Sequence, residues 1–291
     1  MDNPYLTKLR ITFAGLLFYW FLPIRKQIVL SNIDIVFKNT ATHAEKTRLA
    51  KAFYSHVASI LKEIFRMHWL NNKKWSKRVE IHGIEHLEKA FKQNRGIILL
   101  TGHLGNWELT STIGFALLKN QFGQFNVIRR PLRAKWLERI LFKKLKNSGL
   151  NIISSVDAPK KISQSIKNKE IVAFAMDQHV QIENRSGVAV EFFGVKAGTY
   201  RSLAFFVHKY QTPVVPGACY RKQNGKHIMR FYPELDWEYH ADKEQAIYQN
   251  TLRYNQALEQ LILEHPEQWW WFIGDGNYSL IDFDLSIVNL H

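Results

Sequence analysis

From Val79 onward, short apolar runs alternate with helical patterns, and this alternation constrains the fold more than any other feature. The runs are VEIHG, GIILLT, FNVIR, LNIIS, IVAFAM, TPVVPGACY and HIMRFYP. Between them lie stretches that we predict as helices, including residues 85–92, 134–146 and 247–261, the last ending at His265-Pro266. Strands that alternate with helices are typical of α/β proteins. We therefore predict an α/β fold, with a layered sheet flanked by helices and largely parallel or mixed strands.

The N-terminal part is organised differently. We predict membrane-anchoring and amphipathic helices in residues 1–75 and the α/β domain in residues 76–291. Residues 11–24 (ITFAGLLFYWFLPI) carry no charge and are flanked by basic side chains. Fourteen helical residues rise only about 21 Å, less than the roughly 30 Å hydrocarbon core of a bilayer. We expect an anchor in the membrane interface; a buried core helix and a full span are the alternatives. The amphipathic helix predicted at 45–67 shows no residue that points to chemistry.

The charge balance narrows the choice of partners. Forty Lys and Arg against 25 Asp and Glu leave a formal net charge of +15, which favours acidic partners. Basic residues are spread along the chain without a basic arm or zinc-ligand pattern, so we expect no nucleic-acid partner. Cys219 is the only cysteine. It excludes intrachain disulfides and cysteine-based metal clusters, and it fits a cytoplasmic setting.

One histidine lies where a predicted strand gives way to a helix. The segment GIILLTGHLGNWELT places His103 just past a buried strand and Glu108 in the first turn of the next helix. In α/β sheets, function tends to lie at such strand ends. A histidine there can take a proton from a hydroxyl while a carboxylate fixes its other ring nitrogen. From the spacing alone, a structural interpretation is favoured: Glu108 complements the helix dipole, and His103 is a hydrogen-bonded core histidine.

The same segment resembles a known family. GIILLTGHLGNWEL is similar to the HxxxxE/D block of the late acyltransferases of lipid A biosynthesis (lauroyl and myristoyl transferases), within the wider glycerophosphate acyltransferase superfamily. Further blocks follow in the family's order: VIRRPL, AFAMDQH, VEFFGVKAGTYRSLA and TPVVPGACYR. The resemblance covers roughly residues 25–271. Five ordered blocks are far more specific than any one of them.

The resemblance implies an enzyme that transfers a fatty acyl chain from an acyl thioester to a hydroxyl of a lipid A precursor. His103 is then the general base and Glu108 its orienting partner. Arg130 is expected to stabilise the oxyanion or hold an anionic headgroup, and Asp177 to shape the site. Without the resemblance, Arg130 is a surface cation and Asp177 a turn residue. The residues expected to bind substrate are Arg130, Asp177, Phe193, Gly194 and Thr199.

The family also implies partners and a location. The expected donor is acyl carrier protein or acyl-coenzyme A, and the acceptor is a glycolipid at the cytoplasmic face of the bacterial inner membrane. We expect no cofactor and no metal. The chain departs from the family near its end, where HPEQWWWF is followed by IGDGN without the usual arginine. Another glycolipid or an aminolipid is therefore an alternative acceptor. A hydrolase with the same residue pair and a catalytically silent membrane-binding protein of the same fold are the alternative functions.

Overall fold

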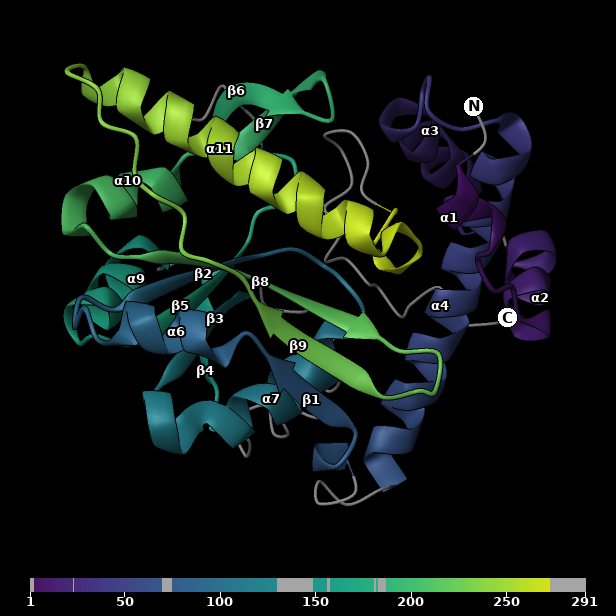
Figure 1. Cartoon of the computed structure of the whole chain (residues 1–291), viewed down its shortest axis with the longest axis horizontal. Coiled ribbons are helices and arrows are strands. Elements are labelled where there is room, and N and C mark those ends of the chain that lie inside the picture. Colours follow the sequence, from purple (N-terminus) through teal and green to yellow (C-terminus); the bar gives the residue numbers. More distant parts are fainter. Residues whose placement is uncertain are drawn as a thin grey trace.

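The computed structural model describes residues 3–22, 24–69, 75–129, 149–155, 158–180, 182 and 187–272, apart from the side chains of residues 67–69. Within these residues, a helical N-terminal part lies beside a central sheet that has helices on both faces (Figure 1). The N-terminal helices are α1 (Pro4–Thr7), α2 (Phe13–Phe21), α3 (Lys26–Val36) and α4 (His43–Trp69). The predicted helix at 134–146 lies outside the described residues.

The central sheet has seven strands in the order β1-β9-β8-β2-β5-β3-β4 within the described part of the chain. Its neighbours pair in parallel except β8 and β9, which form an antiparallel hairpin. The strands are β1 (Val79–His82), β2 (Ile97–Thr101), β3 (Phe125–Arg129), β4 (Asn151–Ser154), β5 (Ile171–Ala175), β8 (Val214–Arg221) and β9 (His227–Phe231). Strands β6 (Gly187–Phe192) and β7 (Val195–Tyr200) form a separate antiparallel hairpin. The mixed α/β sheet confirms the predicted fold class.

Alternating side chains of the central strands divide the core into two layers, as expected for a sheet buried on both faces. Ile97 and Leu99 of β2 pack into a cluster with apolar residues of α6 (Ile84–Phe91) and α7 (Trp107–Phe122). Ile98 and Leu100 point the other way, into a larger cluster. That cluster includes residues of α9 (Ala158–Lys167), α10 (Ser202–Tyr210) and α11 (Lys243–Glu264).

The N-terminal helices belong to this larger cluster. After α11, a short 3-10 turn (Pro266–Gln268) leads into Trp269–Phe272, whose rings are all buried and of which Trp270 and Phe272 contact Phe53 of α4. The Phe53 and Phe272 ring centroids are 4.9 Å apart, and Asn32 Nδ2 donates to the Trp271 carbonyl at 3.1 Å. The helical extension and the sheet layers therefore share one apolar core. The predicted boundary at residues 75 and 76 remains a prediction.

Helix α2 turns a strongly apolar face to solvent. Phe13 and Phe21 are each 77% exposed and Trp20 is 59% exposed, whereas only Gly15 and Tyr19 of this helix are buried. This exposure contradicts the alternative of a buried core helix. Among the described residues, no single helix is both long and apolar enough to cross a bilayer. Helices α2 and α3 pass that test only as a pair, with a bend of 109° between them.

Candidate active site

The register of two neighbouring strands brings His103 and Asp177 together. Strands β2 and β5 pair in parallel with Thr101 opposite Ala175, the last residue of each strand. His103 and Asp177 each follow two residues later. Because the carboxyl ends of parallel strands meet at the same edge of a sheet, the two side chains face one another across the loop region.

The Asp177 carboxylate is hydrogen-bonded to the ring of His103, to the backbone of His103 and to Trp269. Asp177 Oδ1 lies 2.8 Å from His103 Nδ1, and the backbone N–H of His103 donates to Asp177 Oδ2 at 2.6 Å. The indole Nε1–H of Trp269 donates to the same Oδ2 at 3.0 Å. An ionised carboxylate only accepts, so Nδ1 carries the proton and Nε2 carries the lone pair. The ring is therefore fixed in the tautomer that a general base needs.

The electrostatics of this pair favour a charged carboxylate and a basic imidazole. Burial raises the pKa of Asp177, but the charge and hydrogen bonds of His103, together with Trp269, outweigh it and leave the pKa below its ordinary value. Burial lowers the pKa of His103, but the charge and hydrogen bond of Asp177, with a further contribution from Glu108, raise it overall. The Asp177 side chain is fully buried and that of His103 is 17% exposed, so the pair is largely shielded from water.

In the structure the partner of His103 Nδ1 is Asp177 and not Glu108, so the orienting role expected for Glu108 remains a prediction. Asn106 caps α7, accepting from Leu109 N at 3.1 Å, so Glu108 is the second helical residue and its carboxylate meets the end of β3. There it forms an ion pair with Arg129, with Nη2 to Oε1 at 2.9 Å. Its effect on His103 is through charge, which raises the histidine pKa.

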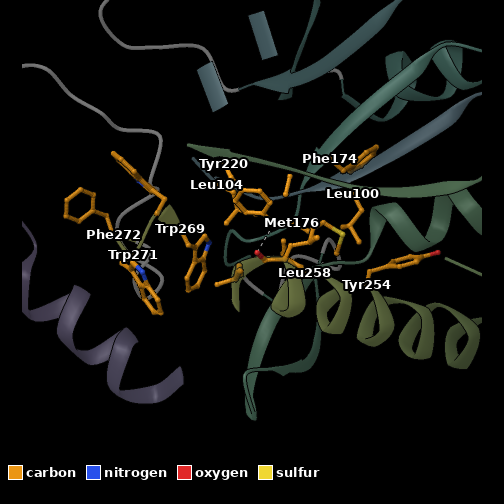
Figure 2. Packing of buried hydrophobic residues seen from close by; sticks show 14 of the residues in the cluster. Leu100, Leu104, Phe174, Met176, Tyr220, Tyr254, Leu258, Trp269, Trp271 and Phe272 are labelled. Carbon is orange, nitrogen blue, oxygen red and sulfur yellow. Dashed lines mark hydrogen bonds between the residues drawn. The ribbon is translucent and has the colours of Figure 1, made fainter. Parts of the chain in front are cut away.

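Aromatic rings enclose the pair on the side of the C-terminal segment. The Trp107 ring stands edge-on to His103 at 5.1 Å between centroids, and Trp270 stands edge-on to Trp107 at 5.0 Å. Figure 2 shows Trp269 within the buried cluster that also contains Leu104 and Leu258. The backbone N–H of Trp270 donates to the His103 carbonyl at 3.1 Å. The tryptophan-rich segment is therefore part of the wall of the site.

The other residues expected to bind substrate lie further away. Phe193 and Gly194 form the tip of the β6–β7 hairpin with positive φ values of 51° and 73°, and the Phe193 ring reaches Trp269 at 6.0 Å between centroids. Thr199 is buried under α11, where its hydroxyl accepts from Asn255 Nδ2 at 3.0 Å. Arg130 lies outside the described residues. Of the residues predicted to bind substrate, Asp177 contacts His103, and Phe193 contacts Trp269, which in turn binds Asp177.

Two contributors to this geometry were not identified from the sequence. Trp269 lies in a run of three tryptophans, and nothing in the run indicates which indole turns toward the site. Arg129 directly precedes the arginine that the family resemblance selected, and nothing in the segment VIRRPL indicates that Arg129 pairs with Glu108 of α7. The composition of both segments indicated that they contribute to the site. The sequence did not indicate which individual side chains would point toward it.

These observations define an α/β protein with a carboxylate–histidine pair at the carboxyl edge of its sheet, an arrangement suited to general-base chemistry. The model of the family described as "Bacterial lipid A biosynthesis acyltransferase" matches residues 4–274, and the chain belongs to that family. This confirms the resemblance inferred from the sequence blocks.

Individual relatives are distant. The chain is 23% identical to a phosphatidylinositol mannoside acyltransferase of Mycolicibacterium smegmatis, over 65% of this chain and 60% of the relative. It is 23% identical to a lipid A biosynthesis acyltransferase of Haemophilus influenzae, over 80% of this chain and 70% of the relative. It is 24% identical to the lipid A biosynthesis lauroyltransferase of Escherichia coli, over 86% of this chain and 78% of the relative. The match thus spans less than two thirds of the mycobacterial relative's length.

Proposed function

We propose that this protein is a membrane-associated O-acyltransferase that moves a fatty acyl chain from an acyl thioester, with acyl carrier protein as the favoured donor, to a hydroxyl of a lipid A precursor. The observation that carries the proposal is the His103–Asp177 pair at the sheet edge, with Nδ1 bound to a buried carboxylate. Membership of the lipid A acyltransferase family supports the same chemistry.

In the proposed reaction, His103 Nε2 removes the proton of the acceptor hydroxyl as its oxygen attacks the thioester carbonyl. The carbon–oxygen bond forms, and the carbon–sulfur bond of the tetrahedral intermediate then breaks. The departing thiolate takes the proton from the imidazolium, which Asp177 stabilises in the meantime. The products are an ester and a free thiol, and no protein nucleophile is needed. General-base assistance of this kind is worth about 10² to 10⁴ in rate.

Membrane association is supported by the surface of α2 and by charge. Aromatic and aliphatic side chains are exposed together on α2, and Lys26 Nζ lies 3.8 Å from the Tyr19 ring centroid. Interfacial helices combine such an apolar face with basic residues that favour anionic lipids. An acceptor that already carries fatty chains stays in the bilayer, because a twelve-carbon chain contributes on the order of 9 kcal/mol of apolar transfer. We place the enzyme at the cytoplasmic face of the inner membrane.

A mannosylated phosphatidylinositol is a second candidate acceptor. Relatives named for phosphatidylinositol mannoside acylation and for lipid A acylation match the chain at almost the same identity. The sequence after Phe272 also lacks the arginine common at the end of lipid A enzymes. Both acceptors are glycolipids, so the proposed role of His103 is the same for each.

The test is transfer of a labelled acyl chain from acyl carrier protein to each glycolipid, using purified wild type, His103→Ala and His240→Ala in detergent. His240 is a matched control because its Nε2 also binds a carboxylate, that of Glu238, at 2.9 Å. We expect transfer by wild type and the control and a loss of at least about a hundredfold in His103→Ala. Equal activity of all three proteins would contradict the mechanism. Wild-type activity toward only one glycolipid would identify the acceptor.

Membrane binding is tested separately with vesicles that contain anionic phospholipid. Replacing Phe13 and Phe21 together with serine removes two exposed rings, and since burying one such ring contributes about 1.5–3 kcal/mol, partitioning should weaken at least about tenfold. Tyr239→Ser is the control, because Tyr239 is 76% exposed yet lies outside the N-terminal helices. Equal partitioning of the two variants would overturn the proposed anchor.

A further inference from the structure

A second buried polar cluster lies on the other side of the loop that carries His103. Its members come from four places in the chain: His56 and Glu63 from α4, Asn106 from the start of α7, Arg221 from the end of β8, and His227 from the start of β9. We call these five residues the α4 network. None of them belongs to the proposed proton-transfer pair.

Glu63 is the centre of the α4 network. Its carboxylate accepts from Arg221 Nε at 2.9 Å, from Arg221 Nη2, and from Asn106 Nδ2 at 2.9 Å. His227 Nε2 lies 3.3 Å from the same carboxylate. Burial raises the pKa of Glu63, but the neighbouring His227 and the hydrogen bonds and charge of Arg221 outweigh it and hold the pKa well below its ordinary value. Glu63 is therefore a charged carboxylate with a two-point guanidinium partner.

Arg221 also determines the state of His56. The guanidinium Nη1 lies 2.6 Å from His56 Nδ1, and arginine only donates, so Nδ1 must be the acceptor. Burial, and then the charge of Arg221, lower the pKa of His56 well below its ordinary value. The ring is therefore neutral with its proton on Nε2. That N–H donates to the Gly105 carbonyl at 3.3 Å.

The α4 network thereby binds Gly105 and Asn106, the last two residues of the loop that carries His103. His56 binds the carbonyl of Gly105, and Glu63 binds the side chain of Asn106, the cap of α7. Gly105 has a φ of 61°, and a Cβ there would lie 2.3 Å from the Cys219 carbonyl oxygen, so the loop has no room to shift toward β8. The other end of the loop is bound at His103 N by Asp177. The loop is thus held from both sides.

We propose that Glu63 and Arg221 are positioning residues that act through Gly105 and Asn106 to set the place of His103 relative to the reacting hydroxyl. This rests on the proposed function. A buried ion pair contributes little stability compared with well-packed apolar side chains, so its value here lies in the geometry that it fixes. Displacing a catalytic group by about 1 Å can cost on the order of a hundredfold in rate, even from a distant substitution.

The test compares Glu63→Gln with Glu80→Gln. Glu80 of β1 is the matched control because it also binds two basic side chains, Lys222 and Lys226 of the β8–β9 turn, each at 3.0 Å, at a more exposed position than Glu63. We expect kcat to fall about tenfold to a hundredfold in Glu63→Gln with KM for donor and acceptor within about twofold of wild type. Glu80→Gln should match wild type. A change in KM alone, or unchanged kcat, would overturn the proposal.

A second readout needs no acceptor and separates this proposal from the proposed function. The ¹⁵N resonances of His103, assigned by their absence in His103→Ala, report the tautomer and titration of the ring. Glu63→Gln should shift them and Glu80→Gln should not; unshifted resonances in both variants would overturn the positioning role, whatever the acceptor is. If Glu63→Gln does not fold, Asn106→Ser replaces it, because serine keeps the helix cap but cannot reach Glu63.

Discussion

The buried His56 and the partly buried His103 lie on opposite sides of one loop and have opposite electrostatic character. Asp177 raises the pKa of His103, whereas burial and Arg221 lower the pKa of His56. In both rings the partner at Nδ1 fixes the tautomer, but the carboxylate leaves a lone pair on Nε2 and the guanidinium leaves a proton there. The sign of the neighbouring charge thus makes one histidine a candidate base and the other a neutral hydrogen-bond donor.

The largest expected effect comes from removing the charge beside His103. Asp177→Asn keeps an oxygen that can accept from the backbone and from Trp269, so the fold should survive. The neutral amide no longer stabilises the imidazolium, and it also permits the tautomer of His103 that carries the proton on Nε2. We expect kcat/KM for acyl transfer to fall on the order of 10² to 10⁴. An effect below tenfold in a folded variant would show that Asp177 does not serve His103.

A smaller effect is expected from the indole that supports the carboxylate. Trp269→Phe removes one hydrogen bond to a charged group, and we expect roughly a tenfold loss of kcat. Trp271→Phe is the matched control, because its Nε1–H donates instead to the Pro266 carbonyl at 2.6 Å. Both variants should lose some stability in thermal unfolding, but only Trp269→Phe should lose transfer activity. Equal loss of activity would assign the whole tryptophan segment a packing role.

The two histidines should also give opposite dependences of stability on pH. The folded pKa of His56 lies below the unfolded value of about 6.5, so wild type loses stability as pH falls below about 6.5, by up to about 1.4 kcal/mol per pH unit. His56→Gln has no titrating group at this position and therefore does not lose stability in this way as the pH falls. The stability advantage of wild type over His56→Gln should therefore shrink between pH 7.5 and 5.5 in urea unfolding.

His103 provides the contrasting case. Its folded pKa is raised, so its contribution is fully present below about pH 6.5 and is lost as pH rises through the folded pKa. The stability advantage of wild type over His103→Gln should grow over the same fall in pH. The same trend in both variants would remove the contrast between the two rings.

The smallest expected effect concerns Glu108. Its charge raises the pKa of His103 without a direct hydrogen bond, so Glu108→Gln should move the rise of kcat/KM with pH to lower pH. This shift should be smaller than that in Asp177→Asn, because Asp177 raises the pKa of His103 more than Glu108 does. A loss of activity as severe as that of His103→Ala would instead support direct orientation by Glu108.

The contrast also explains what the sequence could and could not predict. The alternation of apolar runs predicted the α/β layers and the strand end that carries His103. The partner of His103 lies 74 residues further on and depends on the β2–β5 pairing, which no local pattern contains. The apolar spacing of α4 predicted a helix but gave no role to its polar residues. Glu63 lies 158 residues and His56 165 residues before Arg221, the partner that they share at the end of β8.

The pH dependence of kcat/KM for acyl transfer in wild type and Asp177→Asn tests the central claim most directly. A general base must be neutral, so the wild-type activity should rise with pH through a His103 pKa above about 6.5. In Asp177→Asn the rise should move to lower pH and reach a much lower plateau. A rise that stays at the same pH, or moves to higher pH, would contradict the assignment of His103 and Asp177 as the catalytic base and its partner.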